Sequence, residues 1–392
     1  MCETLLRCCL SNATKADVLN TLSLPQGQQV LVTEFADDPV SAIEQHLQLV
    51  EQAPPDPAQL KPNEILIRIR SAAVAWVDLL MTSGQYQHMP EPPYTPGMEY
   101  SGDVLAVGSD VAPSQIDVGD RVFADFMQVG PRSYDGYQKA SGYATYAVLP
   151  AHAAFRIPDG FSYDEACNLL GNYETAYHCL ITRGQLQAGE TVLITGASGS
   201  TGMAAVQVAK LLGATVIATG RSDEKLALVR EMGANHVVNT RTEEGSGVRR
   251  FRDEVKALTG GRGVDVVYDT VGGDTSLECL RAMAFGGRLL IVGWTSTPDV
   301  ARGRGQRGAP NANQLPTNII QMKSLTIMGS PAVIAVKQNP SLRPPRVAQI
   351  LQWVAEGKIR PNISHRFALT AFREAMLARW RGEVLGGCVL HP

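Results

Sequence analysis

The sequence lacks the features of disulfide-bonded, zinc-ribbon and membrane-spanning proteins. Its 392 residues include seven cysteines, an odd number, and no two of them form a Cys-x-x-Cys pair. Neither a disulfide framework nor a zinc knuckle is indicated, so we expect a reducing compartment, the cytoplasm. No apolar run approaches the ~20 residues that cross a bilayer, and we therefore expect no membrane partner.

Neither sign of charge dominates the chain. It has 35 basic and 38 acidic residues, and its formal net charge is −3. This balance does not point to nucleic acid as the main partner. Hydrophobic residues make up 44% and charged residues 19%, as in globular rather than disordered proteins. The length exceeds that of one ordinary core, so we expect two domains.

The first half has the pattern of an antiparallel β domain. Apolar residues alternate with others from Ile65 to Ile69, which indicates a half-buried strand. Short β-like runs follow at 102–107, 120–124 and 143–149, separated by Gly, Pro and Asp turns. We therefore predict a barrel-like domain in this half.

After about residue 158 strands alternate with helices, which favours a parallel sheet covered on both faces. The predicted strands are 191–195, 215–218, 264–269, 288–292 and 325–328, with helices at 202–212 and 222–232. The last stretch predicts a helix at 347–356, a strand near 363–367 and a helix at 371–379. Segments 37–62 and 299–314 have the composition of insertions, and the second is flexible and basic.

The central motif is a buried strand that leads into a glycine-rich turn and a helix. Residues 191–202 read TVLITGASGSTG, and an apolar helix follows. Read as A-x-G-x-x-G, Ala197 starts the turn, Gly199 lets backbone amides approach a pyrophosphate, and Gly202 allows close helix packing. A glycine turn that binds nothing is the alternative, and the strand before and helix after it favour phosphate binding. The predicted cofactor-binding residues here are Ala197, Ser198, Gly199, Ser200, Thr201 and Gly202.

The end of the next strand indicates which nicotinamide cofactor is bound. NAD sites usually present Asp or Glu there, whereas this strand ends in Thr-Gly. Arg221, Ser222 and Lys225 cluster where a 2′-phosphate would lie. Charge-assisted hydrogen bonds of about 1.5–3 kcal/mol each would favour NADPH over NADH. Asp223 and Glu224 suit the first turn of a helix, and solvated surface charge is the alternative interpretation of the cluster.

These motifs together resemble the medium-chain dehydrogenase/reductase superfamily, in its zinc-independent quinone oxidoreductase (zeta-crystallin-like) branch. The stretch from Gly189 to Lys210 is similar to the branch's signature, with Ser200 in place of the second glycine of a Gly-Gly pair. Further landmarks are PGMEYSG at 96–102, VGDRV at 118–122, GYATY at 142–146 and DTVGG at 269–273. The resemblance extends over most of the chain from about residue 63.

The resemblance implies an α/β protein in which a GroES-like β-barrel catalytic domain accompanies a Rossmann domain with a doubly wound parallel sheet. We expect an N-terminal extension (1–28), the first part of the catalytic domain (29–160), the NADP-binding Rossmann domain (161–335) and the rest of the catalytic domain (336–392). Family members are commonly dimers through edge strands of the Rossmann sheet, so a homodimer through 325–329 is expected. In the extension, Cys2, Cys8 and Cys9 are possible palmitoylation sites, although a loosely ordered extension is the simpler interpretation.

Departures from the zinc-containing relatives indicate a metal-free site. Those relatives place a catalytic Cys and His where this sequence has Ala75 and Met98, and no Cys lies between Cys9 and Cys167. A zinc-activated mechanism would lack its ligands, so no metal is expected. Bacterial quinone reductases of the branch carry Asn and Tyr at the positions of Ala75 and Leu80, which implies a more apolar pocket here.

The same resemblance implies roles for further residues. Thr175 would lie near the nicotinamide, the backbone at Gly293 and Gly329 would bind its carboxamide, and Thr240 stands where relatives often have a Tyr near the adenosine phosphate. The expected substrate pocket consists of Trp76, Leu80, Tyr86 and Trp294, although plain core packing explains its aromatic residues equally well. The candidates for a proton donor are Tyr86, Tyr100 and Tyr173.

The predicted function is NADPH-dependent hydride transfer to a quinone or an α,β-unsaturated carbonyl compound, a small electrophilic acceptor, without zinc. One alternative is an enoyl-thioester (enoyl-CoA or acyl-carrier) reductase, in which Arg302, Arg304 and Arg307 would meet CoA phosphates. An alternative of another class is an NADPH-binding interaction or RNA-binding protein without turnover, supported only by the same Arg-Gly run. A short-chain reductase is excluded because no Tyr-x-x-x-Lys occurs.

Overall fold

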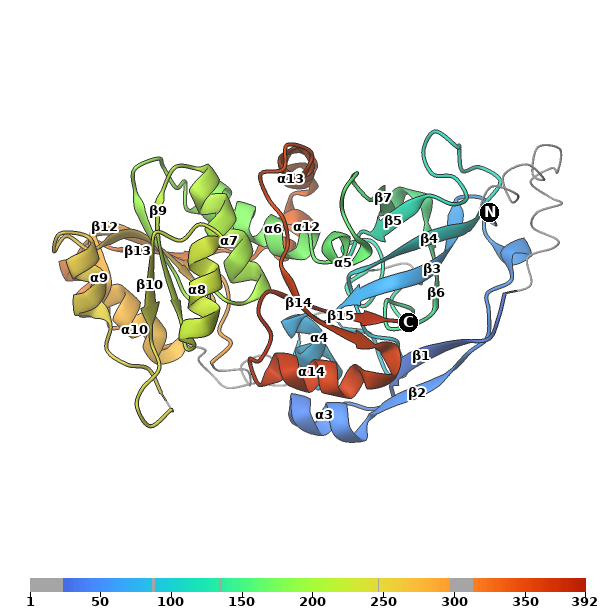
Figure 1. Cartoon of the computed structure of the whole chain (residues 1–392), viewed down its shortest axis with the longest axis horizontal. Helices are drawn as coiled ribbons and strands as arrows, with labels where there is room; N and C mark the ends of the chain where they lie inside the picture. The colour runs from blue at the N-terminus through green and yellow to red at the C-terminus, as the bar shows by residue number, and fades with distance from the viewer. Residues whose placement is uncertain (1–23, 87–88, 134–135, 246, 297–312) are drawn as a thin grey trace.

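Two lobes, each built on its own sheet, make up the protein (Figure 1). The computed structural model describes residues 24–86, 89–133, 136–245, 247–296 and 313–392. One lobe contains a six-stranded parallel sheet and the other a seven-stranded, mainly antiparallel sheet. The α/β class with a GroES-like part and a Rossmann part is therefore confirmed.

The parallel sheet has the strand order β10-β9-β8-β11-β12-β13. Its strands are β8 (Thr191–Ile194), β9 (Thr215–Gly220), β10 (His236–Asn239), β11 (Val264–Asp269), β12 (Met283–Ile291) and β13 (Thr326–Gly329). The helices between them are α7 (Ser200–Leu211), α8 (Asp223–Glu231), α9 (Arg252–Leu258), α10 (Gly273–Ala282) and α11 (Thr317–Met322). The chain runs from β8 to β9 on one side and later to β11 on the other. The end of β8 thus lies at the switch point where such sheets bind ligands.

The second sheet has the order β14-β15-β3-β4-β5-β7, and β6 also pairs with β3. Its strands are β3 (Glu64–Ala73), β4 (Tyr100–Val107), β5 (Arg121–Ala124), β6 (Tyr146–Pro150), β7 (Ala154–Arg156), β14 (Ile363–Ala368) and β15 (Gly387–His391). The last two come from the C-terminal stretch, after α13 (Arg343–Ala355) and around α14 (Phe372–Trp380). The chain therefore leaves this lobe, forms the parallel sheet and returns to complete the antiparallel one.

The segment predicted as an insertion at 37–62 contains regular secondary structure. It contains α3 (Pro39–Gln45) and β2 (Leu47–Gln52), and β2 pairs with β1 (Gly27–Val32) in an antiparallel ribbon. Asp38 caps α3, because its carboxylate accepts free backbone amides in the first turn of the helix. Pro39, which has no N–H to satisfy, starts that turn. Cys2, Cys8 and Cys9, and most of the basic segment 299–314, lie outside the described residues.

Four further short helices belong to the described chain. They are α4 (Trp76–Thr82), α5 (Tyr163–Ala166), α6 (Leu170–Tyr177) and α12 (Ala332–Gln338). Figure 1 shows α6, α12 and α13 between the two sheets, so the site at the end of β8 is bordered by elements of both lobes. None of the described helices combines the length and the apolar character that a bilayer span requires.

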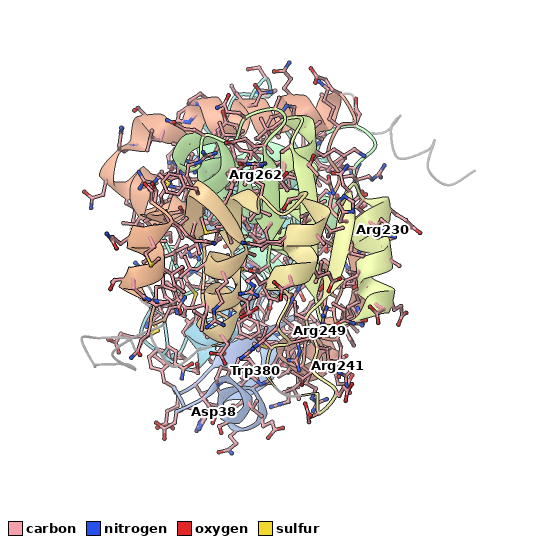
Figure 2. All side chains as sticks on the ribbon, turned by 90° about the vertical axis from the view of Figure 1, so that its left-hand side faces the viewer. Asp38, Arg230, Arg241, Arg249, Arg262 and Trp380 are labelled. Atoms are coloured by element: carbon pink, nitrogen blue, oxygen red, sulfur yellow. The ribbon has the colours of Figure 1, made fainter. Side chains whose placement is uncertain are left out.

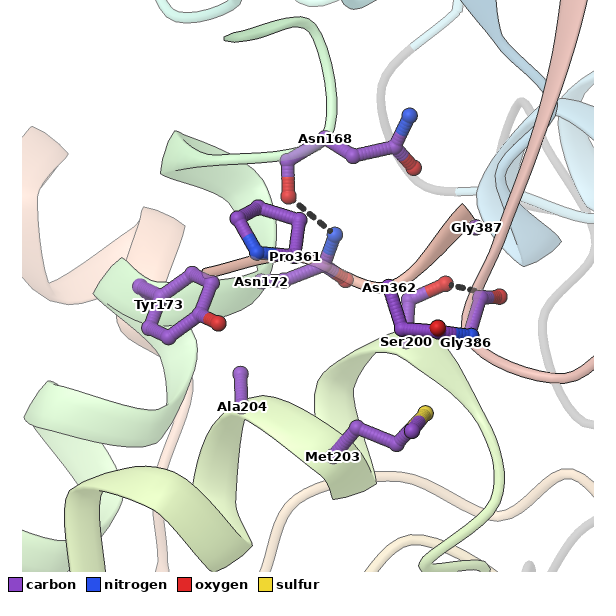
Figure 3. A pocket seen from close by; sticks show the side chains of 10 residues that line it. All are labelled: Asn168, Asn172, Tyr173, Ser200, Met203, Ala204, Pro361, Asn362, Gly386 and Gly387. Carbon is purple, nitrogen blue, oxygen red and sulfur yellow. Dashed lines mark hydrogen bonds between the residues drawn. The ribbon is translucent and has the colours of Figure 1, made fainter. Parts of the chain in front are cut away.

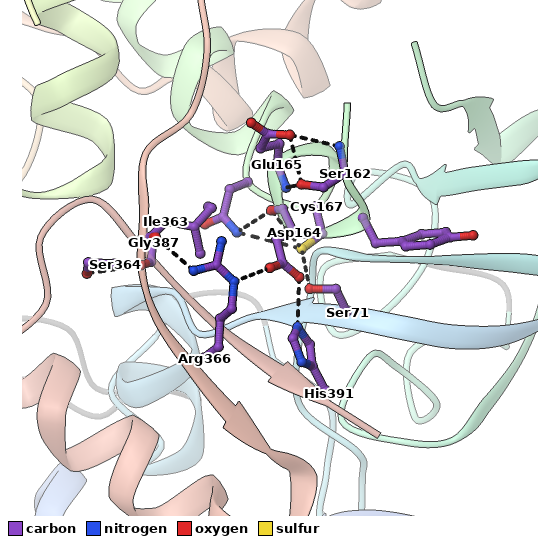
Figure 4. A network of polar contacts seen from close by, with 12 residues as sticks. Ser71, Ser162, Asp164, Glu165, Cys167, Ile363, Ser364, Arg366, Gly387 and His391 are labelled. Carbon is purple, nitrogen blue, oxygen red and sulfur yellow. Dashed lines mark hydrogen bonds and ion pairs between the residues drawn. The ribbon is translucent and has the colours of Figure 1, made fainter. Parts of the chain in front are cut away.

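A polar network fastens the last strand to the start of α5 (Figure 4). Asp164 accepts hydrogen bonds from Arg366 Nε at 2.7 Å and pairs with His391 Nε2 at 2.8 Å. Burial alone would raise the pKa of Asp164, but hydrogen bonds from His391, Ser71 and Arg366 outweigh it and lower the pKa to about 2. The ionised carboxylate therefore stabilises the folded state.

We predict that Asp164→Asn lowers the free energy of unfolding by about 2 kcal/mol at pH 7. Because the folded pKa lies below the ordinary value, the carboxylate's contribution is complete above about pH 4 and is lost as the pH falls toward 2. Urea unfolding at several pH values measures the free energy of unfolding of both proteins. The difference in this free energy between wild type and variant should become smaller as the pH falls through that window. Asp159→Asn, at an exposed position, is the control; a difference independent of pH would contradict the prediction.

Candidate functional site

The glycine turn between β8 and α7 has the geometry of an anion site. Gly196 adopts φ 58°, in the left-handed region that favours glycine. A Cβ at Gly202 would lie 2.4 Å from the carbonyl oxygen of Gly196, so only glycine lets α7 pack this closely. Gly199 is the N-cap of α7 and supplies no side-chain cap, which leaves first-turn amides without a side-chain acceptor. These features fit a dinucleotide pyrophosphate.

The C-terminal tail crosses this turn (Figure 3). The Gly386 amide donates to the Ser198 carbonyl at 2.8 Å, and Ser200 Oγ donates to the Gly386 carbonyl at 2.7 Å. Thr201 Oγ1 donates to Asn172 Oδ1 on α6 at 3.0 Å. Turn, tail and α6 therefore meet at one place. A pocket there is lined by Asn168, Asn172, Tyr173, Ser200, Met203, Ala204, Pro361, Asn362, Gly386 and Gly387.

The predicted 2′-phosphate residues follow β9, and each already has a partner. The Arg221 guanidinium donates to the Gly245 carbonyl, and Ser222 is the N-cap of α8. Lys225 Nζ donates to the backbone carbonyls of Gly382 and, at 2.6 Å, of Glu383, both in the tail. Burial lowers the pKa of Lys225. The hydroxyl of Thr240, which is buried, donates to the Gly220 carbonyl at 3.2 Å, at the tip of β9.

Thr175 is fixed from the other lobe by a buried carboxyl group. Thr175 Oγ1 donates to the Gly171 carbonyl at 2.7 Å, and the Gly171 amide donates to Glu99 at 2.8 Å. Burial raises the pKa of Glu99 to about 7. A Cβ at Gly171 would lie 2.6 Å from that carboxylate, so Glu99 packs directly on α6.

Ala75 and Met98, at the positions of the zinc ligands in zinc-containing relatives, offer backbone amides to a carboxylate instead. Asp78 accepts the amide of Ala75 at 2.9 Å and those of Gly97 and Met98 at 3.3 Å. Burial raises the pKa of Asp78 to about 6. Within the described ranges, no three His, Cys, Asp or Glu side chains are grouped so as to hold a metal ion.

The predicted pocket residues fall into separate environments. Trp76 stacks on Trp380 of α14, with ring centroids 5.1 Å apart, and thus packs between helices. Leu80, on α4, is partly buried. Gly293 and Trp294 follow β12, where the Gly293 amide donates to the Asp269 carbonyl at 3.2 Å. Gly329 ends the neighbouring β13, opposite Ile291, so the backbones at 293 and 329 lie on adjacent strand ends.

The three candidate proton donors differ in access. Burial raises the pKa of both Tyr100 and Tyr173, and the Tyr173 hydroxyl donates to Gln207 Oε1 at 3.0 Å. Both rings belong to hydrophobic cores. Tyr86 is only partly buried, and its oxygen accepts a hydrogen bond from Arg132 Nη2 at 2.6 Å. Of the three, Tyr86 therefore has the environment best suited to meet a small molecule.

Similarity to known proteins agrees with this geometry. The family models described as "Alcohol dehydrogenase GroES-like domain" and "Zinc-binding dehydrogenase" match residues 61–159 and 200–341. Quinone oxidoreductase-like protein 2 of Bos taurus is 35% identical over 330 residues, covering 84% of this chain and 84% of that protein. The chain belongs to the medium-chain dehydrogenase/reductase superfamily, in its zinc-independent quinone oxidoreductase family. It is an oxidoreductase.

Solved structures of this superfamily have the same architecture. The native structure of a mycobacterial protein complexed with NADPH is 26% identical and superposes with a TM-score of 0.73 over 93% of this chain and 100% of that one. A quinone oxidoreductase of Pseudomonas syringae is 25% identical, with a TM-score of 0.71 over 93% of this chain and 100% of that one.

Several contacting groups of this site were not predicted from the sequence. Arg132 lies in an irregular stretch between β5 and β6, where no periodic pattern signals its role. Asn172 and Gly386 contact the turn, and Glu383 contacts Lys225, from distant parts of the chain. No local signal in the sequence indicated these contacts.

Proposed function

We propose that this member of the superfamily is an NADPH-dependent oxidoreductase that transfers a hydride to a quinone or an α,β-unsaturated carbonyl compound without zinc. The observation that carries the proposal is the uncapped start of α7 at the switch point, next to a β9 that ends in glycine rather than a carboxylate. The NADPH complex of the mycobacterial relative supports the choice of cofactor.

In this proposal the Rossmann lobe binds both ends of NADPH. The amides of residues 197–202 bind the pyrophosphate, and Arg221, Ser222 and Lys225 bind the 2′-phosphate. Thr175 and the backbone at Gly293 and Gly329 hold the nicotinamide, in a cleft with Thr240 near the adenosine end. When bound, NADPH supplies the hydride. The chain's own residues orient the acceptor and exclude water.

The acceptor side is proposed to be apolar, because Ala75 and Leu80 offer no side-chain hydrogen bond. Tyr86 and Trp294 border it, and Trp76 supports α4 from behind through its stack on Trp380. Such a pocket suits a planar, electron-poor molecule more than a charged one. The enoyl-thioester reductase and the RNA-binding protein without turnover depend on Arg302, Arg304 and Arg307. These residues lie outside the described part of the chain, and both alternatives stay predictions.

Cofactor preference tests the phosphate site. Arg221→Ala should raise the Kd of NADPH about 10- to 100-fold and that of NADH less than about threefold, because only NADPH carries the 2′-phosphate. Fluorescence titration measures both constants. Arg230→Ala, in the last turn of α8, the helix that follows Arg221, is the matched control and should change neither dissociation constant. Figure 2 shows Arg230 apart from Arg241 and Arg249, which lie beyond the end of β10. Equal losses for both cofactors would contradict the site.

The acceptor class is tested by NADPH oxidation with a panel. We expect turnover with a quinone or an enone and much slower turnover with crotonyl-CoA, because the acceptor side is proposed to be apolar. Faster reaction with crotonyl-CoA would favour the enoyl-thioester reductase. No turnover with any acceptor, together with RNA gel shifts that disappear on deleting residues 301–308, would favour the binding protein.

A homodimer through the outer edge of the parallel sheet is part of the same proposal. β13 is the edge strand, and two large apolar side chains lie exposed beside it, Phe285 at 79% and Met322 at 75%. The Gly286 amide donates to the Lys323 carbonyl at 2.9 Å, which brings the two exposed side chains into one patch. Such a patch marks an association surface.

Met322→Asp should convert the dimer to a monomer, because a charge would be buried in the interface. Light scattering after size exclusion gives the mass. Val118→Asp, at a half-exposed apolar residue of the other lobe, should leave the mass unchanged. A monomeric wild type would contradict the proposed dimer.

A further inference from the structure

Arg132 and Tyr86 form a polar pair, and Tyr86 is one of the residues expected in the substrate pocket. Arg132 Nη2 donates to Tyr86 Oη at 2.6 Å, and the guanidinium carbon lies 5.2 Å from the centroid of the Tyr86 ring. A guanidinium has only donors, so the tyrosine oxygen accepts this bond and keeps its own hydrogen for another acceptor. Tyr86 is only partly buried, as a residue that meets a bound molecule has to be.

The Arg132 side chain is itself largely removed from water. It is 8% exposed, and its guanidinium lies 5.7 Å from the centroid of the Phe126 ring. Its Nε is buried and has no hydrogen-bond partner among the residues that the structure describes. Burial raises the pKa of Asp78 and of Glu99, and the Arg132 charge acts against both increases. A desolvated guanidinium with an unused donor is costly, so such a residue is expected to serve a specific partner.

The charge of Arg132 and two hydrogen bonds relate this pair to α6. The Arg132 charge acts against the increase in the pKa of Glu99, Glu99 accepts the Gly171 amide, and the Gly171 carbonyl accepts the Thr175 hydroxyl. Thr175 is the residue expected beside the nicotinamide. The carboxylate that supports α6 is therefore sensitive to the charge of the residue that holds Tyr86.

We propose that Arg132 is the positioning residue that makes Tyr86 the proton donor for the acceptor, and that this pair selects acceptors whose oxygen becomes negative during reduction. This inference rests on the proposed function, because the hydride comes from NADPH. In a site of low dielectric, a fixed guanidinium stabilises both the developing oxyanion and the phenolate that remains after proton loss.

The step balances as follows for an enone. The β carbon receives a hydride and forms a C–H bond, and the electron pair of the C=C bond moves to give an enolate. The O–H bond of Tyr86 then breaks, its proton bonds to the enolate, and its electron pair stays on the tyrosine oxygen. Arg132 holds this phenolate until water returns a proton. A quinone that has accepted a hydride is a hydroquinone monoanion, which takes its second proton from Tyr86 in the same way.

Four variants test the pair kinetically: Tyr86→Phe, Arg132→Met, Arg132→Lys and the double variant Tyr86→Phe/Arg132→Met. We expect Tyr86→Phe and Arg132→Met each to lower kcat about 100-fold while KM changes less than about threefold. The double variant should be no worse than Tyr86→Phe, and Arg132→Lys should recover about tenfold over Arg132→Met. The solvent deuterium isotope effect on kcat should increase in Arg132→Met, because protonation becomes the slowest step.

A binding measurement tests the site without turnover. The probe is 4-nitrophenol in the presence of NADP⁺, because its ionised form absorbs visible light and resembles a hydroquinone monoanion. The wild type should bind the phenolate form, and Arg132→Lys should keep this affinity. Arg132→Met should bind the phenolate at least about tenfold more weakly. Arg121→Met is the matched control, since Arg121 lies 4.5 Å over the ring of Tyr163 in the same lobe. It should change neither kinetics nor binding.

The possible results separate this inference from the function on which it rests. A wild type that turns over, with Arg132→Met unchanged in kcat and isotope effect, overturns the role of Arg132 and leaves the proposed function intact. The role of Arg132 is also overturned if the losses in kcat of the two single variants add in the double variant and the Tm falls. Such a result means that Arg132 only neutralises Asp78 and Glu99. If no acceptor is reduced, the proposed function fails, and the 4-nitrophenol titration still decides whether Arg132 and Tyr86 form an anion site.

Discussion

The buried ion cluster around Arg343 is the interaction on which the geometry between the lobes depends. Arg343 begins α13 and donates to Asp125, which follows β5, and to Glu174 on α6, at 2.8 Å in each case. Both carboxylates are buried. Removing one partner of such a cluster leaves an uncompensated buried charge, at a cost of about 3–5 kcal/mol. Because Glu174 and Thr175 are neighbours on α6, the cluster fixes where the proposed nicotinamide site lies relative to the antiparallel sheet.

The sequence predicted the elements whose signal is local. Alternating apolar residues identified β3, and the glycine turn identified the passage from β8 to α7, because periodicity and glycine spacing are properties of short segments. The helix and strand within 37–62 were not predicted from the sequence, although the Asp38-Pro39 pair before that helix is a local N-cap signal.

Contacts that join distant segments were beyond the sequence. The resemblance implied a pocket position for Trp76 but gave no sign that its ring stacks on Trp380, about three hundred residues away along the chain. Arg132 shows no pattern at all, because an irregular stretch has no period to reveal which way a side chain points. The fold class and the glycine turn between β8 and α7 were thus predictable. The partners of individual polar side chains, which determine chemistry, were not.

At the positions of the zinc ligands in zinc-containing relatives, this chain has a hydrogen-bonded turn. Asp78 accepts the amides of Ala75, Gly97 and Met98, so a single buried carboxylate organises the segment. The backbone here is therefore held by hydrogen bonds from one side chain.

Lys225 links two properties that an enzyme engineer would wish to adjust separately. Its ammonium group binds carbonyl oxygens of the tail that leads into β15, and its position after β9 makes it a proposed ligand for an extra phosphate. Any replacement of this lysine loosens the attachment of the final strand together with the proposed cofactor site. A change in coenzyme use in such a variant would therefore reflect both effects. Arg221 donates to the Gly245 carbonyl and not to the tail, so its charge can be changed without loosening the final strand.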